Sequence, residues 1–257
     1  MWIKTLAVCF LIFSAAATTS AKEHYRIGTQ DFDYSPQYNF TGRKDKGYAW
    51  AVFETFAEQN NISFEYVPLP LKRLQSELRK GTVDFVYPDN ARWHENEEHH
   101  LHGMKFSRAL TMAVYGTMVH HQRQDIGLSN FRSVAFPQGF VPTKWHKLHQ
   151  QQKLQLIETS TAEIAIKMVL RGRADGADIE YSVTQYILDK IGHAGELQMD
   201  EALPLTIVGF RLSSIKHKEL LEKFDLFLQE NKELVNDLKA AYGLQESVLA
   251  DRHHQGS

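Results

Sequence analysis

Polar and aromatic side chains gather just beyond the end of one predicted strand. Directly after the strand predicted at 83–87 come Asp89, Asn90, Arg92 and Trp93. Asp and Asn supply hydrogen-bond acceptors and donors, Arg supplies a fork for a carboxylate, and Trp supplies a flat stacking face. Ligands of open α/β sheets bind outside the carboxyl ends of the strands. The segment therefore predicts part of a binding site, although a plain turn uses the same residue types.

Two further strand ends carry residues that suit a site. Gly139 and Phe140 follow the strand predicted at 133–136, and Glu180 follows the one predicted at 174–179. Backbone N–H groups ahead of a helix can hold an anionic group, so the glycine loop is either an anion site or an ordinary connection. Glu180 is either a ligand-binding carboxylate or one that the helix dipole favours at a helix start.

The sequence lacks the motifs of covalent catalysis, nucleotide binding and metal binding. It contains no G-x-S-x-G elbow, no glycine-rich phosphate loop and no dinucleotide fingerprint. The histidine-rich segment 94–102 does not match the His-Glu-x-x-His zinc motif, because Glu98 stands where the second histidine belongs. We expect a solvated polar loop there, no metal and no cofactor.

Residues 1–21 predict a secretory signal peptide. Lys4 is their only charge, 6–13 are all apolar and 14–21 are all small. The apolar run is too short for a membrane-spanning helix, which takes about 20 residues. Cys9 is the only cysteine of the chain, so the mature protein has none. This favours a bacterial periplasmic protein whose core needs no disulfide bonds.

Length and charge exclude several classes of partner. The 236 residues left after removal of 1–21 suit one large domain or two small ones. The full chain holds 29 Lys and Arg against 31 Asp and Glu, without a basic stripe. We therefore expect no nucleic-acid partner and no membrane-binding surface. The tail 251–257 is the only segment predicted to be disordered.

One short phrase occurs twice, about 90 residues apart. Leu-Arg-Lys-Gly-Thr-Val-Asp spans 78–84, and Leu-Arg-Gly-Arg-Ala-Asp spans 170–175. Each predicts a helix end, a glycine cap, a turn and then a buried strand. The segments 25–87 and 133–191 both alternate strands with helices, which is typical of parallel sheets with right-handed crossovers. The chain therefore predicts two similar α/β lobes.

Two extended apolar segments, 112–119 and 205–210, predict paired strands that cross between the lobes. The segment 217–242 is predicted to be helical. Each lobe is expected to have its own sheet, without a single sheet running through both. The expected boundaries are 22–113 and 211–250 for lobe 1, and 114–210 for lobe 2.

These features together resemble the bacterial extracellular solute-binding proteins of the amino-acid type, family 3, which serve ABC transporters. The resemblance covers about 25–244. It rests on short sequence features that are weak one by one but occur in a specific order. These features are Gly47, Leu69-Pro70 with Arg73, Gly81 to Asp84, Phe106-Ser107, Gly139, Arg173 to Asp175 and Ile207 to Phe210. It implies an α/β, two-lobed periplasmic-binding-protein type II fold. Each lobe is then a mainly parallel sheet flanked by helices, with two hinge strands and the ligand in the cleft.

The resemblance also implies roles for site residues. Glu180 falls at the acidic position that takes the ammonium group of a ligand, and the loop of Gly139 and Phe140 is one that holds an anionic group. The family carries a carboxylate-binding arginine about four residues beyond Arg92. That place falls in 96–98 here, so Arg92 is an approximate match. This departure counts against a plain α-amino acid as ligand.

The segment 33–38 resembles the aromatic–proline loop of the family, which makes Tyr34 and Tyr38 candidate walls of the site. Arg73 begins a helix beside Leu69-Pro70 and faces either the cleft or the solvent.

The resemblance implies periplasmic binding of a small polar solute, an amino acid or related small carboxylate, by hinge closure. The partner is then an inner-membrane ABC permease or a sensor, and the protein is a monomer and no enzyme. A periplasmic enzyme similar to cyclohexadienyl dehydratase is one alternative, with Glu180 and Arg92 or Arg73 in acid–base roles. A stand-alone sensor subunit is another, and an aromatic-walled cationic ligand is also compatible.

Overall fold

The computed structural model describes residues 22–42, 44–94 and 102–245. The predicted signal peptide, the tail 251–257 and most of the histidine-rich segment lie outside these residues. None of the helices within them is long and apolar enough to cross a membrane.

Strands and helices alternate along most of the chain. The strands are β1 (Glu23–Gln30), β2 (Ile62–Leu69), β3 (Phe85–Asp89), β4 (Lys105–His120), β5 (Ser133–Pro137), β6 (Gln155–Thr159), β7 (Gly176–Glu180), β8 (Leu197–Met199) and β9 (Thr206–Ser214). The α-helices are α1 (Tyr48–Gln59), α2 (Leu71–Lys80), α3 (His146–Gln150), α4 (Ala162–Leu170), α5 (Tyr181–Lys190), α6 (Lys218–Glu230) and α7 (Lys232–Ala241). Short 3-10 turns include η1 (Ala91–His94) and η5 (Thr143–Trp145).

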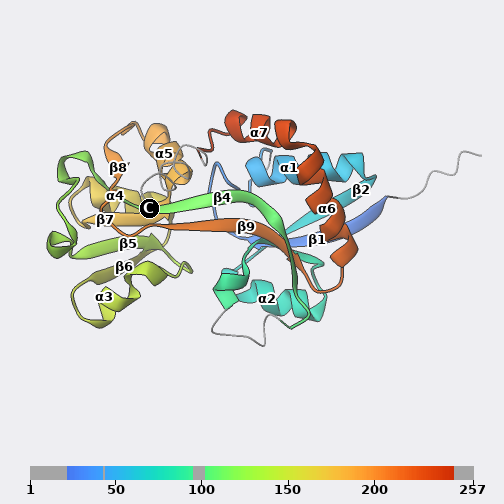
Figure 1. Ribbon diagram of the computed structural model, residues 1–257, viewed down its shortest axis with the longest axis horizontal. Coiled ribbons are helices and arrows are strands. Elements are labelled where there is room, and N and C mark those ends of the chain that lie inside the picture. The colour runs from blue at the N-terminus through green and yellow to red at the C-terminus, as the bar shows by residue number, and fades with distance from the viewer. Residues whose placement is uncertain (1–21, 43, 95–101, 246–257) are drawn as a thin grey trace, which may run out of the picture.

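The elements form two lobes that β4 and β9 connect (Figure 1). The first lobe holds β1, β2 and β3 with α1, α2, α6 and α7, and the second holds β5 to β8 with α3, α4 and α5. The predicted two-lobed fold with two hinge strands is confirmed. The lobe boundaries at 113/114 and 210/211 stay a prediction, because β4 and β9 pass through them without a break.

Parallel pairing builds the centre of each lobe. β1 lies between β2 and β3, and β5 lies between β6 and β7, with all four pairs parallel. The expectation of two separate sheets is wrong, since pairing runs in the order β2-β1-β3-β9-β4-β7-β5-β6. The hinge strands cause this continuity. β4 is 16 residues long, so it pairs with β9 over most of its length and then with β7 in the second lobe.

The segment predicted to be helical at 217–242 forms two helices, α6 and α7. Asn231 interrupts it, with φ −106° and ψ 36° between α6 and α7. Its side-chain Nδ2 donates to the Phe227 carbonyl oxygen at 3.0 Å. Asparagine is unfavourable inside helices, because its side chain can take the place of a helical backbone hydrogen bond in this way. The apolar stripe on both sides of the break nevertheless stays on the core, with Phe224 and Val235 buried.

The loop that precedes α1 requires glycine at position 47. Gly47 has φ +88°, and a Cβ atom there would lie 2.9 Å from the Pro36 carbonyl oxygen and from the Tyr38 Cα. We expect Gly47→Ala to lower the free energy of unfolding by about 1–3 kcal/mol from the backbone conformation alone, with the clash in addition. Urea denaturation measures the loss. Gly127→Ala is the matched control, because Gly127 has φ +74° but open space around it; equal losses in both variants would contradict the clash.

Candidate functional site

A groove of about 960 Å³ lies between the lobes. Its lining residues come directly after β1 and β2 in the first lobe and after β5 and β6 in the second. The first lobe contributes Asp31, Phe32, Asp33, Ser35, Pro70, Leu71 and Lys72, and the second contributes residues of 136–142, 158–163 and α5 together with His146 and Leu156. The carboxyl ends of four parallel strands therefore face one space, which is where ligands bind in open α/β sheets.

Two of the predicted site residues, Gly139 and Phe140, line this groove. Their loop reaches the first lobe: a Cβ atom on Gly139 would lie 3.1 Å from Leu71 Cδ2. The Phe140 ring packs against the rings of Phe32 and Tyr34, with centroid distances of 5.6 and 5.3 Å. The lobes thus contact each other through the aromatic side chains of Phe140, Phe32 and Tyr34.

Tyr34 connects the two lobes, whereas Tyr38 packs inside the first. The Tyr34 hydroxyl donates to the Tyr115 hydroxyl on β4 at 3.2 Å and accepts from the Glu180 backbone N–H at 3.2 Å. Burial raises the pKa of the Tyr34 phenol well above its usual range. The buried Tyr38 hydroxyl donates to Gln30 Oε1 instead.

Glu180 is both a helix cap and a buried charge site. Its Oε2 accepts from the Val183 backbone N–H at 2.8 Å at the start of α5, and the residue is 1% exposed. Burial raises the pKa of its carboxyl group to about 7, opposed by hydrogen bonds from Val183 and Ser182 and by the Gln37 side chain. No described Lys, Arg or His forms an ion pair with Glu180.

Sequence reasoning missed Gln37, which reaches Glu180 from the first lobe. Its backbone carbonyl accepts from Ala49 N at 3.0 Å, which fixes the loop to the start of α1. The residue is fully buried, yet neither its Nε2 nor its Oε1 has a hydrogen-bond partner among the residues that the structure describes. The only sequence signal was its position between the two tyrosines of the aromatic–proline loop.

Sequence reasoning also missed a buried ion pair in the second lobe. Lys144 Nζ donates to Asp178 Oδ1 at 2.7 Å and to the Tyr115 carbonyl oxygen at 2.6 Å. Burial lowers the pKa of Lys144 and raises that of Asp178, while their mutual attraction opposes both shifts. No sequence pattern links the two residues, because they lie 34 positions apart in η5 and β7.

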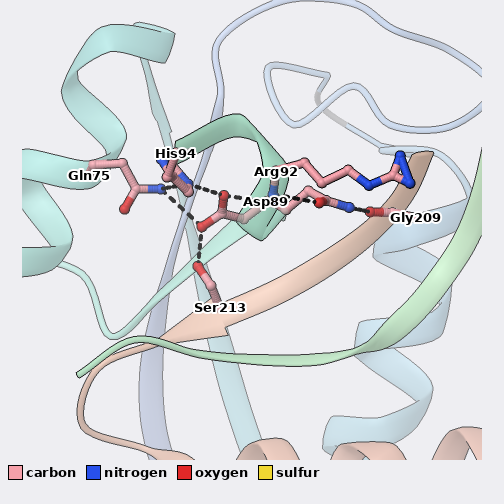
Figure 2. Close-up of polar contacts among 7 residues, drawn as sticks. Gln75, Asp89, Arg92, His94, Gly209 and Ser213 are labelled. Carbon is pink, nitrogen blue, oxygen red and sulfur yellow. Dashed lines mark hydrogen bonds and ion pairs between the residues drawn. The ribbon is translucent and has the colours of Figure 1, made fainter. Parts of the chain in front are cut away.

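Asp89 is occupied by contacts within the first lobe (Figure 2). Its carboxylate accepts from Gln75 Nε2 at 2.9 Å, from Ser213 Oγ at 2.5 Å and from the Asn90 backbone N–H at 2.8 Å. His94 Nε2 lies 2.7 Å from Asp89 Oδ1. The residue is 1% exposed, so it joins α2, η1 and β9 and does not line the groove.

The residues after Asp89 lie along β9 and likewise outside the groove lining. Asn90 Nδ2 donates to the Gly209 carbonyl oxygen at 2.7 Å, and Asn90 Oδ1 accepts from the Arg92 backbone N–H at 3.0 Å. The side chain of Arg92 extends away from Asp89 (Figure 2). Trp93 is 44% exposed and packs edge-on against Phe210, with centroids 6.0 Å apart.

Arg73 lies on the surface of α2. Its side chain is 61% exposed, and its Nη2 donates to Glu77 Oε1 at 3.3 Å. It does not line the groove. Of the histidine-rich segment, the structure describes only His94 and His102, and within the described residues no group of three or more His, Cys, Asp or Glu is placed to hold a metal ion.

No family model and no curated protein matches the sequence. Solved structures share the fold. The substrate-binding protein of an amino acid ABC transporter has a TM-score of 0.64 and 17% identity, covering 86% of this chain and 100% of that chain. The periplasmic VFT2 domain of Bordetella pertussis BvgS has a TM-score of 0.67 and 16% identity, covering 85% and 93%.

A third structure with this fold is the ancestral amino acid-binding protein AncCDT-1, a precursor of cyclohexadienyl dehydratase. Its TM-score is 0.63 at 18% identity, covering 85% of this chain and 95% of that chain. Similarity at these identities establishes the fold, which is the periplasmic-binding-protein fold that the resemblance implied.

Proposed function

We propose that this protein binds a small polar solute between its lobes and closes over it by hinge motion. One observation carries the proposal: the carboxyl ends of four parallel strands, two from each lobe, line a single groove. Among the described strands, β4 and β9 pass from one lobe to the other, so they can act as the hinge about which the lobes rotate. The groove volume lies in the range of pockets that hold small molecules.

The solute is then passed to an inner-membrane ABC permease or reported to a sensor, and the protein acts as a monomer in the periplasm. Proteins of both kinds share the fold: an amino acid transporter component and the periplasmic domain of BvgS. The predicted signal peptide supports the same location. A bridging solute would stabilise the closed form because both lobes contact it at once.

We propose a carrier rather than an enzyme. The enzymatic alternative draws support from AncCDT-1 and from Glu180, whose pKa of about 7 suits acid–base work. The two functions differ in what happens to a bound solute. A solute recovered unaltered after prolonged incubation supports the carrier, and a converted product supports the enzyme.

An engineered disulfide tests hinge closure directly. A Cβ atom on Gly139 would lie 3.7 Å from Leu71 Cβ, within the usual range for disulfides. Cys9, in the predicted signal peptide, is the only cysteine of the chain. We expect oxidised Leu71→Cys/Gly139→Cys protein to be locked closed. Its radius of gyration, measured by X-ray scattering without ligand, should increase on reduction as the lobes separate.

The single variants Leu71→Cys and Gly139→Cys are the controls, because each carries the local change without the bond. Their scattering should not respond to the reductant. Identical curves for the oxidised and reduced double variant, with the bond confirmed by mass, would contradict hinge opening.

A further inference from the structure

Strand β6 has one unpaired edge. Among the described strands it pairs with β5 alone, so it ends the sheet in the second lobe (Figure 1). The Gln155 backbone N–H donates to the Arg132 carbonyl oxygen at 2.8 Å, which directs the backbone groups of Gln155 toward β5. Backbone groups alternate in direction along a strand, so those of Leu156 and Glu158 point away from β5. They can pair with a further strand.

The sequence of β6 does little to prevent such pairing. Proteins commonly protect sheet edges with proline or lysine. β2, which ends the sheet in the first lobe, contains Pro68. β6 contains neither proline nor lysine, and Glu158 is its only charged residue. The edge of β6 is therefore the better template for an added strand.

The groove between the lobes borders this edge. Leu156 and Glu158 both belong to its lining. Leu156 packs with the second-lobe cluster around Trp145, whereas the next residue, Ile157, packs against the main hydrophobic core on the other face of the sheet. Ile187, which also lines the groove, belongs to that main core. Since side chains of a strand alternate between faces, an added strand would find apolar groups on both.

The size and charges of the groove suit several linked residues better than one amino acid. Its volume of about 960 Å³ is near the upper end of the range for pockets that hold drug-sized ligands. Both lobes supply charges of both signs to the lining: Asp31, Asp33 and Lys72 from the first, and Glu158, Glu163, Lys190 and His146 from the second. A peptide carries an ammonium group and a carboxylate at separate ends, so each end can meet an opposite charge.

We propose that the solute is a short peptide that adds an extended strand to β6, which rests on the proposed function and names its ligand class. The peptide backbone pairs with the outward N–H and C=O groups of Leu156 and Glu158, and its side chains alternate between the two faces of the sheet. The same groove continues to Leu71 and Lys72 of the first lobe. A bound peptide thus contacts both lobes and stabilises the closed form.

A synthetic library of tetrapeptides with free ends tests the proposal, with free amino acids as the comparison. We expect the purified protein to retain tetrapeptides in affinity selection read by mass spectrometry. The tightest of them should raise the melting temperature and bind at least tenfold more tightly than any of its constituent amino acids in calorimetry. N-methylation of one amide at a time should weaken its binding at least tenfold at alternate amides only, because an edge strand bonds through every second residue.

A proline in β6 tests the protein side of the same pairing. Glu158→Pro removes an outward N–H and leaves the bonds of β6 to β5 in place, because proline is tolerated on edge strands where its N–H would face outward. It should weaken binding of the selected tetrapeptide at least tenfold. Glu158→Ala removes the same carboxylate but keeps the N–H, so its loss should be clearly smaller. The N-methylated peptides give the answer on the wild-type protein if the proline variant does not fold.

Several results would overturn the proposal. Free amino acids that bind as tightly as the tetrapeptides would remove the peptide class while leaving solute binding intact. Retention of neither would also remove it, and a wider metabolite screen would then decide whether the groove binds solutes at all. Equal losses in Glu158→Pro and Glu158→Ala, or N-methylation effects without alternation, would contradict strand addition. A dimer in light scattering that Glu158→Pro dissociates would show that a second copy of the chain covers β6 instead.

Discussion

The Glu180→Gln variant is expected to be more stable than the wild-type protein at pH 8, by about 3 kcal/mol, and to lose this advantage at pH 4. The carboxyl group has a pKa of about 7 in the folded protein, against about 4.5 in the unfolded chain. Each pKa unit corresponds to about 1.4 kcal/mol, and the group is fully buried, so solvent screening does not reduce the effect.

The sign of this effect follows from where the proton binds. Between pH 4.5 and 7 the folded protein holds a proton on Glu180 that the unfolded chain has released. The wild-type protein therefore loses stability as the pH rises through this window and reaches its full loss above pH 7. Glutamine carries no charge, and its amide oxygen can still accept from Val183 N–H.

Urea denaturation at pH 4, 6 and 8 on both proteins measures the effect as a difference in unfolding free energy. Glu233→Gln removes an exposed carboxylate of α7 and serves as the control, with a difference that should not change over this range. A difference for Glu180→Gln that is flat from pH 4 to 8 would contradict the buried, uncompensated charge.

A second large effect is expected at the buried ion pair. Lys144→Met should lower the free energy of unfolding by about 3–5 kcal/mol, because it leaves the Asp178 carboxylate buried without its cation. The side chains of Lys144 and Asp178 are only 8% and 7% exposed, so water cannot replace the lost contact. The Tyr115 carbonyl oxygen loses its 2.6 Å donor as well.

The double variant Lys144→Met/Asp178→Leu is the control for this prediction. An apolar pair of similar size avoids the cost of burying two charges, so it should recover most of the loss. Urea denaturation of the wild type, both single variants and the double variant gives the coupling energy directly. A loss below about 1 kcal/mol in Lys144→Met, or a double variant as unstable as the single one, would contradict a buried pair.

Helices, strands and their order could largely be predicted from local sequence signals. Gly81 lies in the left-handed conformation at the end of α2, with φ +73°, as the repeated glycine phrase indicates. The predicted extended segment 112–119 lies within β4, and all but the first residue of the predicted segment 205–210 lies within β9. These predictions are correct because helix caps, hydrophobic periodicity and the order of elements depend on residues close in sequence. The sequence could not show that β4 would join both sheets, because its 16-residue length includes polar positions without a clear alternation.

In the candidate site, too, the position of a loop could be predicted from the sequence, whereas the contacts of its side chains could not. The loop of Gly139 and Phe140 lines the groove because it follows a parallel strand, and topology places such loops at one edge. The direction in which a side chain points could not be predicted in this way. Asp89 and Arg92 also follow a parallel strand, yet Asp89 is held by Gln75 and Ser213 from distant segments. Local sequence carries no information about such partners.

Which charged and polar residues come together at the site depends on the tertiary structure alone. Gln37 and Glu180 come from opposite lobes, and Lys144 finds Asp178 across two elements of the second lobe. Whether an acid is a solvated helix cap or a buried charge with a pKa near 7 depends on what the rest of the chain places over it. The sequence by itself determined two lobes, their connecting strands and an acid at the start of α5. Only the packing of one lobe against the other removed water from that acid and left it without a cation among the residues that the structure describes.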